Sequence, residues 1–192
     1  MARVGLSGAR LAQAGAELAD EVGFDQVTVS ELARRFGVQV ASLYSHVRNS
    51  DDLKTRIATV ALTELADQAT AAVAGRAGRD ALVAVADAYR TYAQSHPGRY
   101  AASRHTSSPT PDFLAAGRRH SELMAAVLRG YDLDEPTRTD AIRMLGSFIH
   151  GYVTLELAGS FGFSSPSSAD TWPRVLGALD SLLRNWPERQ PS

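Results

Sequence analysis

Cysteine is absent from the sequence. Disulfide frameworks, cysteine nucleophiles and thiolate metal sites are therefore excluded, and a reducing compartment fits this composition. No apolar run reaches the roughly 18 residues that a membrane span needs. The first residues carry one charge and then turn polar, so they do not resemble a signal peptide. We expect a soluble protein of the cytoplasm, without contact to a membrane.

A surplus of positive charge is also lacking. The 192 residues include 20 Lys and Arg against 21 Asp and Glu, for a formal charge of −1. Any argument for nucleic-acid binding must therefore rest on a local patch. With 44% hydrophobic and 21% charged residues, the chain lies near the average of folded globular proteins.

Sustained alternation of apolar and polar residues, the pattern of a half-buried strand, is missing as well. Apolar residues recur instead at helical spacing along most of the chain. The pattern predicts an all-α fold of about nine helices. The stripes comprise Leu11, Ala14, Leu18 and Val22; Leu53, Ile57, Val60, Ala61 and Leu65; Leu82, Val85, Ala86, Tyr89 and Tyr92; Leu114, Leu123, Met124, Val127 and Leu128; Ile142, Leu145, Ile149, Val153 and Leu157; and Val175, Leu176, Leu179, Leu182 and Leu183.

Glycine and proline divide these helices. Breaks are expected at Gly37, at residues 75–78, at His96-Pro97-Gly98, at 107–111 and at 164–168. A long helix from about Ser50 to Ala74 is expected to connect an N-terminal and a C-terminal part of the chain. We expect an N-terminal domain over residues 1–48 and a larger helical domain over residues 49–192.

The clearest local signal lies between residues 28 and 47. Thr28 and Glu31 form a capping box, and Glu31 is spaced to pair with Arg35. A small Ala33, a turn-forming Gly37 and an apolar Leu43 have the spacing of a helix-turn-helix. In a helix-turn-helix, the first helix holds the second helix at the protein surface, where it can enter the major groove of DNA. A plain three-helix bundle explains the same spacing.

The flanking residues favour the helix-turn-helix. The segments Glu21–Phe24, Thr28–Val38 and Leu43–Asn49 occur in the order and with the gaps of one known family. Over about residues 7–55 the chain resembles the TetR family of transcriptional regulators. The resemblance implies a homodimer that binds double-stranded operator DNA and responds to a small-molecule ligand.

The resemblance and the residue chemistry together assign a DNA-binding face. Gln39 suits adenine, Val40 and Ala41 suit a thymine methyl group, and Ser42 suits either strand. The predicted DNA-binding residues are Thr28, Gln39, Val40, Ala41, Ser42, Tyr44, His46 and Arg48, with Arg3 and Arg10 as candidates at the start of the chain.

The helix that follows this face departs from the family. Ser50 stands where the family commonly has a lysine that contacts phosphate, and we expect Ser50 to cap the helix instead. The negative charges of Asp51 and Asp52 are expected to weaken a phosphate contact there. The segment from Arg34 to Arg56 contains five basic residues and two acidic ones. We therefore expect DNA binding to be only moderately sensitive to salt.

The C-terminal part resembles the TetR subtype with a Trp-His-Gly signature, with Phe148 before His150-Gly151 in place of the tryptophan. Gly146, Gly151, Ala158 and Gly159 allow two helices to approach closely. Either a homodimer interface or packing within one chain explains them.

Polar and aromatic residues interleaved with the apolar stripes suit a ligand pocket. No nucleophile elbow, phosphate loop or helical metal-ligand pair supports catalysis, so we expect no enzyme, cofactor or metal. We predict a ligand-released repressor; the alternative is a helical adaptor without specific DNA recognition. The predicted ligand-binding residues are Tyr89, Tyr92, Tyr100, Arg104, His105, His120, Met124, Phe148, His150 and Tyr152.

Overall fold

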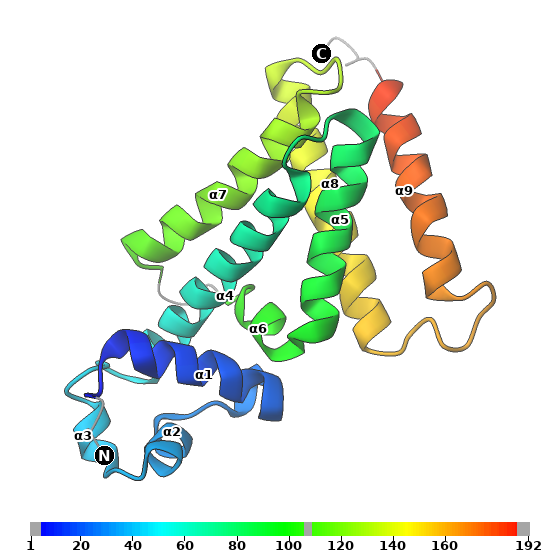
Figure 1. Ribbon diagram of the computed structural model, residues 1–192. Coiled ribbons are helices and arrows are strands. Elements are labelled where there is room, and N and C mark those ends of the chain that lie inside the picture. The colour runs from blue at the N-terminus through cyan, green and yellow to red at the C-terminus, as the bar shows by residue number, and fades with distance from the viewer. Residues whose placement is uncertain (1–4, 106–108, 188–192) are drawn as a thin grey trace, which may run out of the picture. The chain divides into compact units, whose positions relative to one another are not determined.

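The computed structural model describes residues 5–105 and 109–187. Within these ranges it contains nine α-helices, one short 3-10 helix (Phe24–Gln26) and no strand (Figure 1). The expected all-α fold is therefore confirmed. The α-helices are α1 Gly8–Val22, α2 Val29–Phe36, α3 Val40–Leu43, α4 Ser50–Val73, α5 Gly78–Ser95, α6 Pro97–Ala102, α7 Pro111–Leu128, α8 Glu135–Leu157 and α9 Ser168–Arg184.

Side-chain caps fix where several helices begin. Ser7, Thr28, Asp134 and Ser167 each accept a hydrogen bond from a backbone N–H in the first turn of the helix that follows. These acceptors satisfy N–H groups that have no partner inside the helix. None of the described helices is both long enough and apolar enough to span a membrane.

One expected break is different in the structure. His96-Pro97-Gly98 was expected as a loop, but Pro97 opens α6, because the first helical position needs no N–H donor. Gly159 follows the last turn of α8 with a φ of 72°, and Ser160 N–H donates to the Leu155 carbonyl. Gly159 is therefore a left-handed C-terminal cap.

The chain divides into two compact units. The first contains the residues up to Ala66 together with Tyr92–Arg118, and the second contains Asp67–Thr91 together with the residues from Arg119 onward. Helices α4, α5 and α7 each contribute residues to both units. The functional boundary near residue 48 remains a prediction, because compactness groups the chain in another way.

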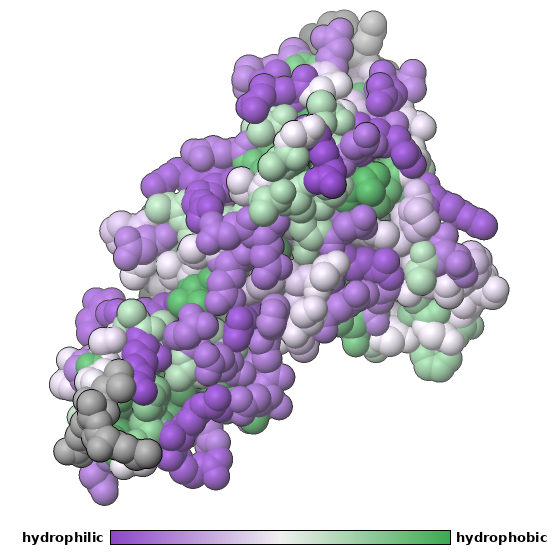
Figure 2. Space-filling view, in the orientation of Figure 1, coloured by the Kyte–Doolittle hydropathy of each residue, from purple (hydrophilic) through white to green (hydrophobic). Residues whose placement is uncertain are grey.

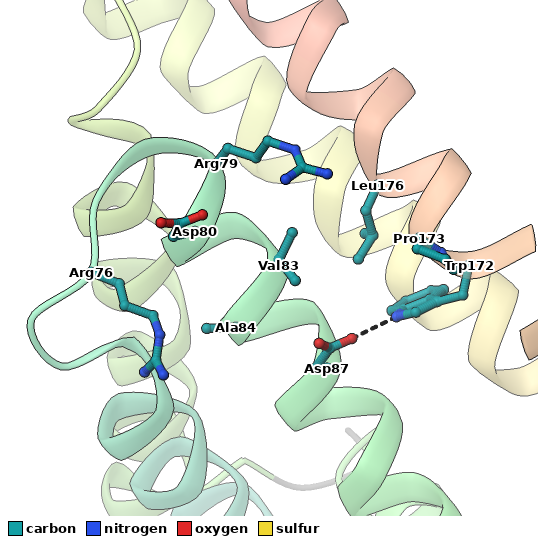
Figure 3. A pocket seen from close by; sticks show the side chains of 9 residues that line it. All are labelled: Arg76, Arg79, Asp80, Val83, Ala84, Asp87, Trp172, Pro173 and Leu176. Carbon is teal, nitrogen blue, oxygen red and sulfur yellow. Dashed lines mark hydrogen bonds between the residues drawn. The ribbon is translucent and has the colours of Figure 1, made fainter. Parts of the chain in front are cut away.

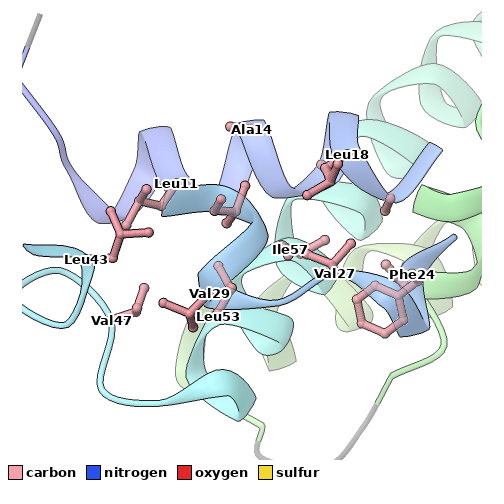
Figure 4. Packing of buried hydrophobic residues seen from close by; sticks show 14 of the residues in the cluster. Leu11, Ala14, Leu18, Phe24, Val27, Val29, Leu43, Val47, Leu53 and Ile57 are labelled. Carbon is pink, nitrogen blue, oxygen red and sulfur yellow. The ribbon is translucent and has the colours of Figure 1, made fainter. Parts of the chain in front are cut away.

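The core of the first unit joins the predicted stripes of α1 and α4. Leu11, Leu43 and Ile57 are completely buried, and Figure 4 shows them in one cluster with Leu53. Val22 was expected in the apolar stripe of α1, but it lies in the last turn of the helix and is 44% exposed. The cluster fixes α1, α2, α3 and the start of α4 as one body.

Helix α6 packs on the end of α1 in the same unit. A Cβ atom at Gly98 would lie 1.8 Å from the Ala19 carbonyl oxygen, so only glycine fits. Asp20 accepts a hydrogen bond from the Arg99 backbone N–H at 2.8 Å and pairs with the Arg99 and His96 side chains. Arg99 also pairs with Glu64 of α4 at 3.0 Å. This polar cluster ties α1, α4 and α6 together.

The core of the second unit uses the other stripes. Leu82, Leu145, Ile149 and Leu176 are at most 1% exposed, as the helical spacing predicts. Leu157 and Leu182 were also expected in the core, but they are 41% and 40% exposed. Leu114 of the first unit is likewise 49% exposed.

Candidate functional site: a helix-turn-helix surface and two aromatic clusters

The turn between α2 and α3 has the geometry that the sequence predicts. Gly37 adopts the left-handed conformation with φ 63° and ψ 36°, and the Val38 N–H donates to the Ala33 carbonyl. Helix α3 begins immediately after Gln39, and its Leu43 is completely buried. The buried leucine anchors α3, and Ala41 and Ser42 of the same helix lie at the surface.

Most of the predicted DNA-binding residues lie at that surface. Gln39, Ala41, Ser42 and Arg48 are exposed, and Tyr44 is 51% exposed. His46 and Val40 are half-buried, and Val40 packs against the core of the unit. Thr28 is exposed, but its hydroxyl accepts the Glu31 N–H at 3.1 Å. Arg3 lies outside the described residues.

The start of α4 differs from the expectation. Asn49, and not Ser50, accepts the Asp52 N–H at 2.8 Å, because the residue that precedes the helix is the one placed to cap it. The Asp52 side chain is only 3% exposed and lies within 4 Å of the guanidinium groups of both Arg48 and Arg56. Two guanidinium groups of the same chain therefore balance the charge of Asp52.

Burial acts to raise the pKa of Asp52, but the hydrogen bond from the Arg48 backbone N–H and the two guanidinium groups outweigh it. The pKa consequently lies below its usual value of 3.8. A carboxylate with a lowered pKa stabilises the fold at pH values above its unfolded-state pKa, and this contribution is lost as the pH falls through the folded-state pKa.

Asp52→Asn is expected to lower the free energy of unfolding near neutral pH by about 1–3 kcal/mol, because two buried charge-assisted contacts become neutral. The difference from the wild type should begin to shrink below about pH 4, where the unfolded chain gains a proton, and should vanish below the lowered pKa of folded Asp52. Urea unfolding near pH 7 and near pH 3 measures both effects. Asp51→Asn, at the exposed neighbouring position, is the matched control. Equal losses at both pH values would contradict the assignment.

The charges of α2 are also paired within the first unit. The expected Glu31–Arg35 pair is wrong: Glu31 pairs with Arg34, one residue nearer. Arg35 pairs with Glu21 at 2.7 Å and approaches Glu17 at 3.5 Å, both on α1. The tertiary fold brings these acids closer to Arg35 than its helical neighbour. Fewer free cations remain for phosphate than the sequence count suggests.

The ten predicted ligand-binding residues are distributed over both units. Tyr92, Tyr100, Arg104 and His105 belong to the first unit. The Tyr92 hydroxyl donates to Glu64 at 3.1 Å, and burial followed by the charge of Glu64 raises the pKa of Tyr92 above its usual range. Tyr100 is 3% exposed, and the ring of His105 meets that of Phe24 edge to face.

The other six lie in the second unit, where five of them form two aromatic clusters. The ring of Tyr89 meets the rings of His120 and His150, with centroids 5.7 and 5.8 Å away, and its hydroxyl is hydrogen-bonded to His120 Nδ1. Phe148 and Tyr152 instead pack against Trp172 of α9. Met124 is buried on α7.

Trp172 and the ion pair beside it are functional candidates that residue type and spacing did not predict. Arg90 pairs with Glu156 and lies over the Trp172 ring at 5.2 Å, while the Trp172 Nε1–H donates to Asp87 at 2.7 Å. These residues come from α5, α8 and α9, and no local spacing relates them. An isolated tryptophan in an amphipathic helix was the only available signal.

A helical protein that presents a helix-turn-helix of this geometry belongs to the DNA-binding regulators. The family model described as bacterial regulatory proteins, tetR family, matches residues 11–54. The model described as tetracyclin repressor-like, C-terminal domain, matches residues 82–179. The chain therefore belongs to the TetR family of transcriptional regulators, a family that is not enzymatic.

Two curated relatives are similar in sequence. The uncharacterized HTH-type transcriptional regulator Rv0681 of Mycobacterium tuberculosis is 35% identical over 142 residues, which cover 73% of this chain and 65% of the relative, slightly less than two thirds of its length. The uncharacterized HTH-type transcriptional regulator YobS of Bacillus subtilis is 29% identical over 163 residues, or 80% of each chain.

Solved structures share the fold. A protein of unknown function from Rhodococcus sp. RHA1 has a TM-score of 0.79 at 19% identity and covers 96% of this chain and 99% of its own. A TetR variant from Acinetobacter baumannii, solved in complex with minocycline, has a TM-score of 0.73 at 22% identity and covers 96% of this chain and 100% of its own.

Proposed function

We propose that the chain is a repressor that binds a palindromic operator as a homodimer and leaves it when a small-molecule ligand binds. The observation that carries this proposal is the surface of α3, where Gln39, Ser42 and Tyr44 are exposed while Leu43 anchors the helix from below. An operator in the genome requires a location in the cytoplasm.

In this proposal α3 enters the major groove. Gln39, Ala41 and Ser42 read base edges, and the half-buried Val40 offers at most its methyl groups to a thymine. Tyr44, His46 and Arg48 contact phosphates, and Thr28 supports the start of α2. No arginine or lysine lies on α3, so the bidentate guanine contact is missing and each half-site is read weakly. Two half-sites compensate for this weakness.

The dimer surface is assigned to α8 and α9. A glycine inside a helix costs on the order of 1 kcal/mol relative to alanine, so it needs a packing reason. A Cβ atom at Gly146, Gly151 or Gly177 would meet nothing within 4 Å, so the described part of the chain provides no such reason. The exposed Leu155, Leu157 and Leu182 add apolar surface on the same helices. Figure 2 also shows apolar residues over the α8–α9 connection. A second copy packed on these helices explains both features.

The ligand site is assigned to the cluster of Tyr89, His120 and His150 together with Met124. An aromatic and apolar wall with a few polar groups is typical of ligand sites. The Acinetobacter TetR structure with minocycline supports a small-molecule ligand for a protein of this fold. The proposal includes membership of the Trp-His-Gly subtype, because the aromatic Phe148 comes shortly before His150-Gly151.

Release from DNA requires that the ligand bind the DNA-incompetent conformation more tightly than the competent one. Helix α4 is the proposed connection, because it supplies residues to both compact units. A tilt of α4 would change the separation of two recognition helices that must span about one DNA turn, roughly 34 Å.

The test is a titration of the purified protein with DNA from its own upstream intergenic region, at two salt concentrations and with an unrelated duplex as competitor. Saturable binding that survives the competitor is expected. The double variant Tyr44→Ala, His46→Ala should bind about 10²- to 10³-fold more weakly, because a dimer loses four contacts of about 1 kcal/mol each.

Gln26→Ala, at an exposed position outside α3, is the matched control and should bind like the wild type. If the double variant kept full operator affinity with its fold intact, the assigned DNA surface would be wrong. If wild-type binding were weak and entirely lost at high salt for every duplex tested, the result would favour the alternative of a helical adaptor.

A further inference from the structure

A cavity of about 560 Å³ opens between α5 and α9 in the second unit (Figure 3). None of the ten residues predicted for ligand binding lines it. Its volume lies within the range of roughly 300–1,000 Å³ that is typical of small-molecule sites. The cavity is therefore separate from the cluster of Tyr89, His120 and His150.

The inner wall of the cavity is apolar. Val83 of α5 and Leu176 and Pro173 of α9 line it, with the edge of Trp172 beside them. Figure 2 shows a strongly apolar area between α5 and α9 with hydrophilic residues around it. This wall suits a hydrocarbon or aromatic body of a ligand.

Trp172 is held rigidly at this wall. Its Nε1–H donates to Asp87, Phe148 stacks on it with an interplanar angle of 17°, and the Arg90 guanidinium lies over its ring. The side chain is only 3% exposed. Trp172 therefore forms a preorganised edge of the cavity and not a ring that a ligand could displace.

The acidic residues of the cavity already have roles. Asp87 accepts the indole hydrogen at 2.7 Å. Asp80 lies in the first turn of α5, where its negative charge interacts favourably with the positive end of the helix dipole. Neither carboxylate is within 4 Å of a cationic group in the described part of the chain.

Among residues 5–105 and 109–187, no carboxylate forms an ion pair with either arginine of the cavity. Arg76 donates to the Ala72 carbonyl, a neutral acceptor. Arg79 adds to the field that lowers the pKa of Asp180, but Asp180 is already bound by Arg184 at 3.1 Å and by Tyr131 at 2.7 Å. Figure 3 shows the Arg79 side chain extended along the mouth of the cavity on the side of Leu176. The charged groups of the cavity that remain available to bind a ligand are therefore the two guanidinium groups, which are cationic.

We propose that this cavity binds an amphipathic organic anion, with its carboxylate at Arg76 and Arg79 and its apolar body against Val83, Pro173 and Leu176. A guanidinium group presents a planar pair of N–H donors that matches a carboxylate. The site does not require DNA binding, so it can be tested even if the proposed repressor function fails.

The probe is octanoate, kept below its critical micelle concentration, with octanol and octylammonium as neutral and cationic probes of the same chain length. Trp186→Phe leaves Trp172 as the single tryptophan, so its emission reports on the cavity. Octanoate should change this emission in a saturable way. Octanol and octylammonium should bind at least about 10-fold more weakly, because they lack the carboxylate.

Three variants in this background locate the site. Arg76→Ala with Arg79→Ala should weaken octanoate binding by about 10-fold or more, because the charge-assisted contacts of both guanidinium groups with the carboxylate are lost. Ala84→Leu should block the cavity without changing its charge. Arg174→Ala removes an exposed arginine of α9 that does not line the cavity, and it should bind like the parent.

Calorimetric titration accompanies the fluorescence, so that binding without an emission change is still detected. Thermal unfolding confirms that each variant is folded. Absence of saturable octanoate binding in both measurements would overturn the proposal. Equal affinity for octanol, or unchanged affinity in the double arginine variant, would overturn it as well.

Discussion

In the dimer that we propose, Gly151→Leu is expected to separate the two copies and to weaken binding to the proposed operator by about 10²- to 10⁴-fold, because the second half-site no longer benefits from the effective concentration that a dimer provides. The leucine meets nothing within its own chain at the position of its Cβ atom. It would, however, collide with a second helix that approaches the glycine from another copy. The folded monomer should therefore survive.

Analytical ultracentrifugation and the DNA titration measure the two effects of Gly151→Leu separately. Thr139→Leu is the matched control, because it places the same side chain at an exposed position nearer the start of α8. A Gly151→Leu protein that remained dimeric and kept its operator affinity would remove α8 from the proposed interface.

The second large effect is expected at Gly98. Gly98→Ala places a methyl group where the Ala19 carbonyl oxygen is 1.8 Å away and its carbonyl carbon 2.1 Å away. Backbone atoms cannot rotate out of the way as a flexible side chain can. Helix α6 must therefore move off α1 and weaken the contacts of Arg99 with Asp20 and Glu64. We expect a loss of about 3 kcal/mol or more in the free energy of unfolding.

Thermal and urea unfolding measure this loss, which corresponds to a decrease of roughly 6–12 °C in Tm for a chain of this size. Gly117→Ala is the control, because a Cβ atom at Gly117 in α7 meets nothing within 4 Å. That change should stabilise the protein by up to about 1 kcal/mol through helix propensity. If both variants melted alike, the close packing of α6 on α1 would be refuted.

The helix-turn-helix could be predicted because its signals are local. Thr28 caps the helix that it precedes, and Gly37 takes the left-handed conformation from which the chain continues into α3. Each of these features depends on neighbours within a few residues. The helical stripes also identified most of the core, since burial of one helix face follows from its own periodicity.

Side-chain partners across the fold could not be predicted in the same way. Arg35 has a suitable acid four residues away in Glu31, but the fold supplies Glu21 from α1. The exposed Leu157 and Leu182 share the periodicity of buried neighbours. Their exposure depends on which face the rest of the chain covers.

The ligand-binding residues show the same limit. Residue type selected ten of them, and the structure distributes these over two compact units, so residue type alone did not define one site. Trp172 and Arg79, which line the proposed anion site, carry no pattern that distinguishes them from ordinary residues of a helix. Their significance depends on the packing of α5 and α9.

The internal ion pairs of the N-terminal unit bear on how such a regulator behaves among the many other sequences of a genome. Arg34, Arg35 and Arg56 are each paired with a carboxylate of their own chain, so few cations remain to displace counterions from arbitrary DNA. Non-specific binding competes with operators for regulator molecules. A regulator with little affinity for arbitrary sequence keeps a larger free pool, so occupancy of the proposed operator would follow the concentration of the proposed ligand rather than the amount of surrounding DNA.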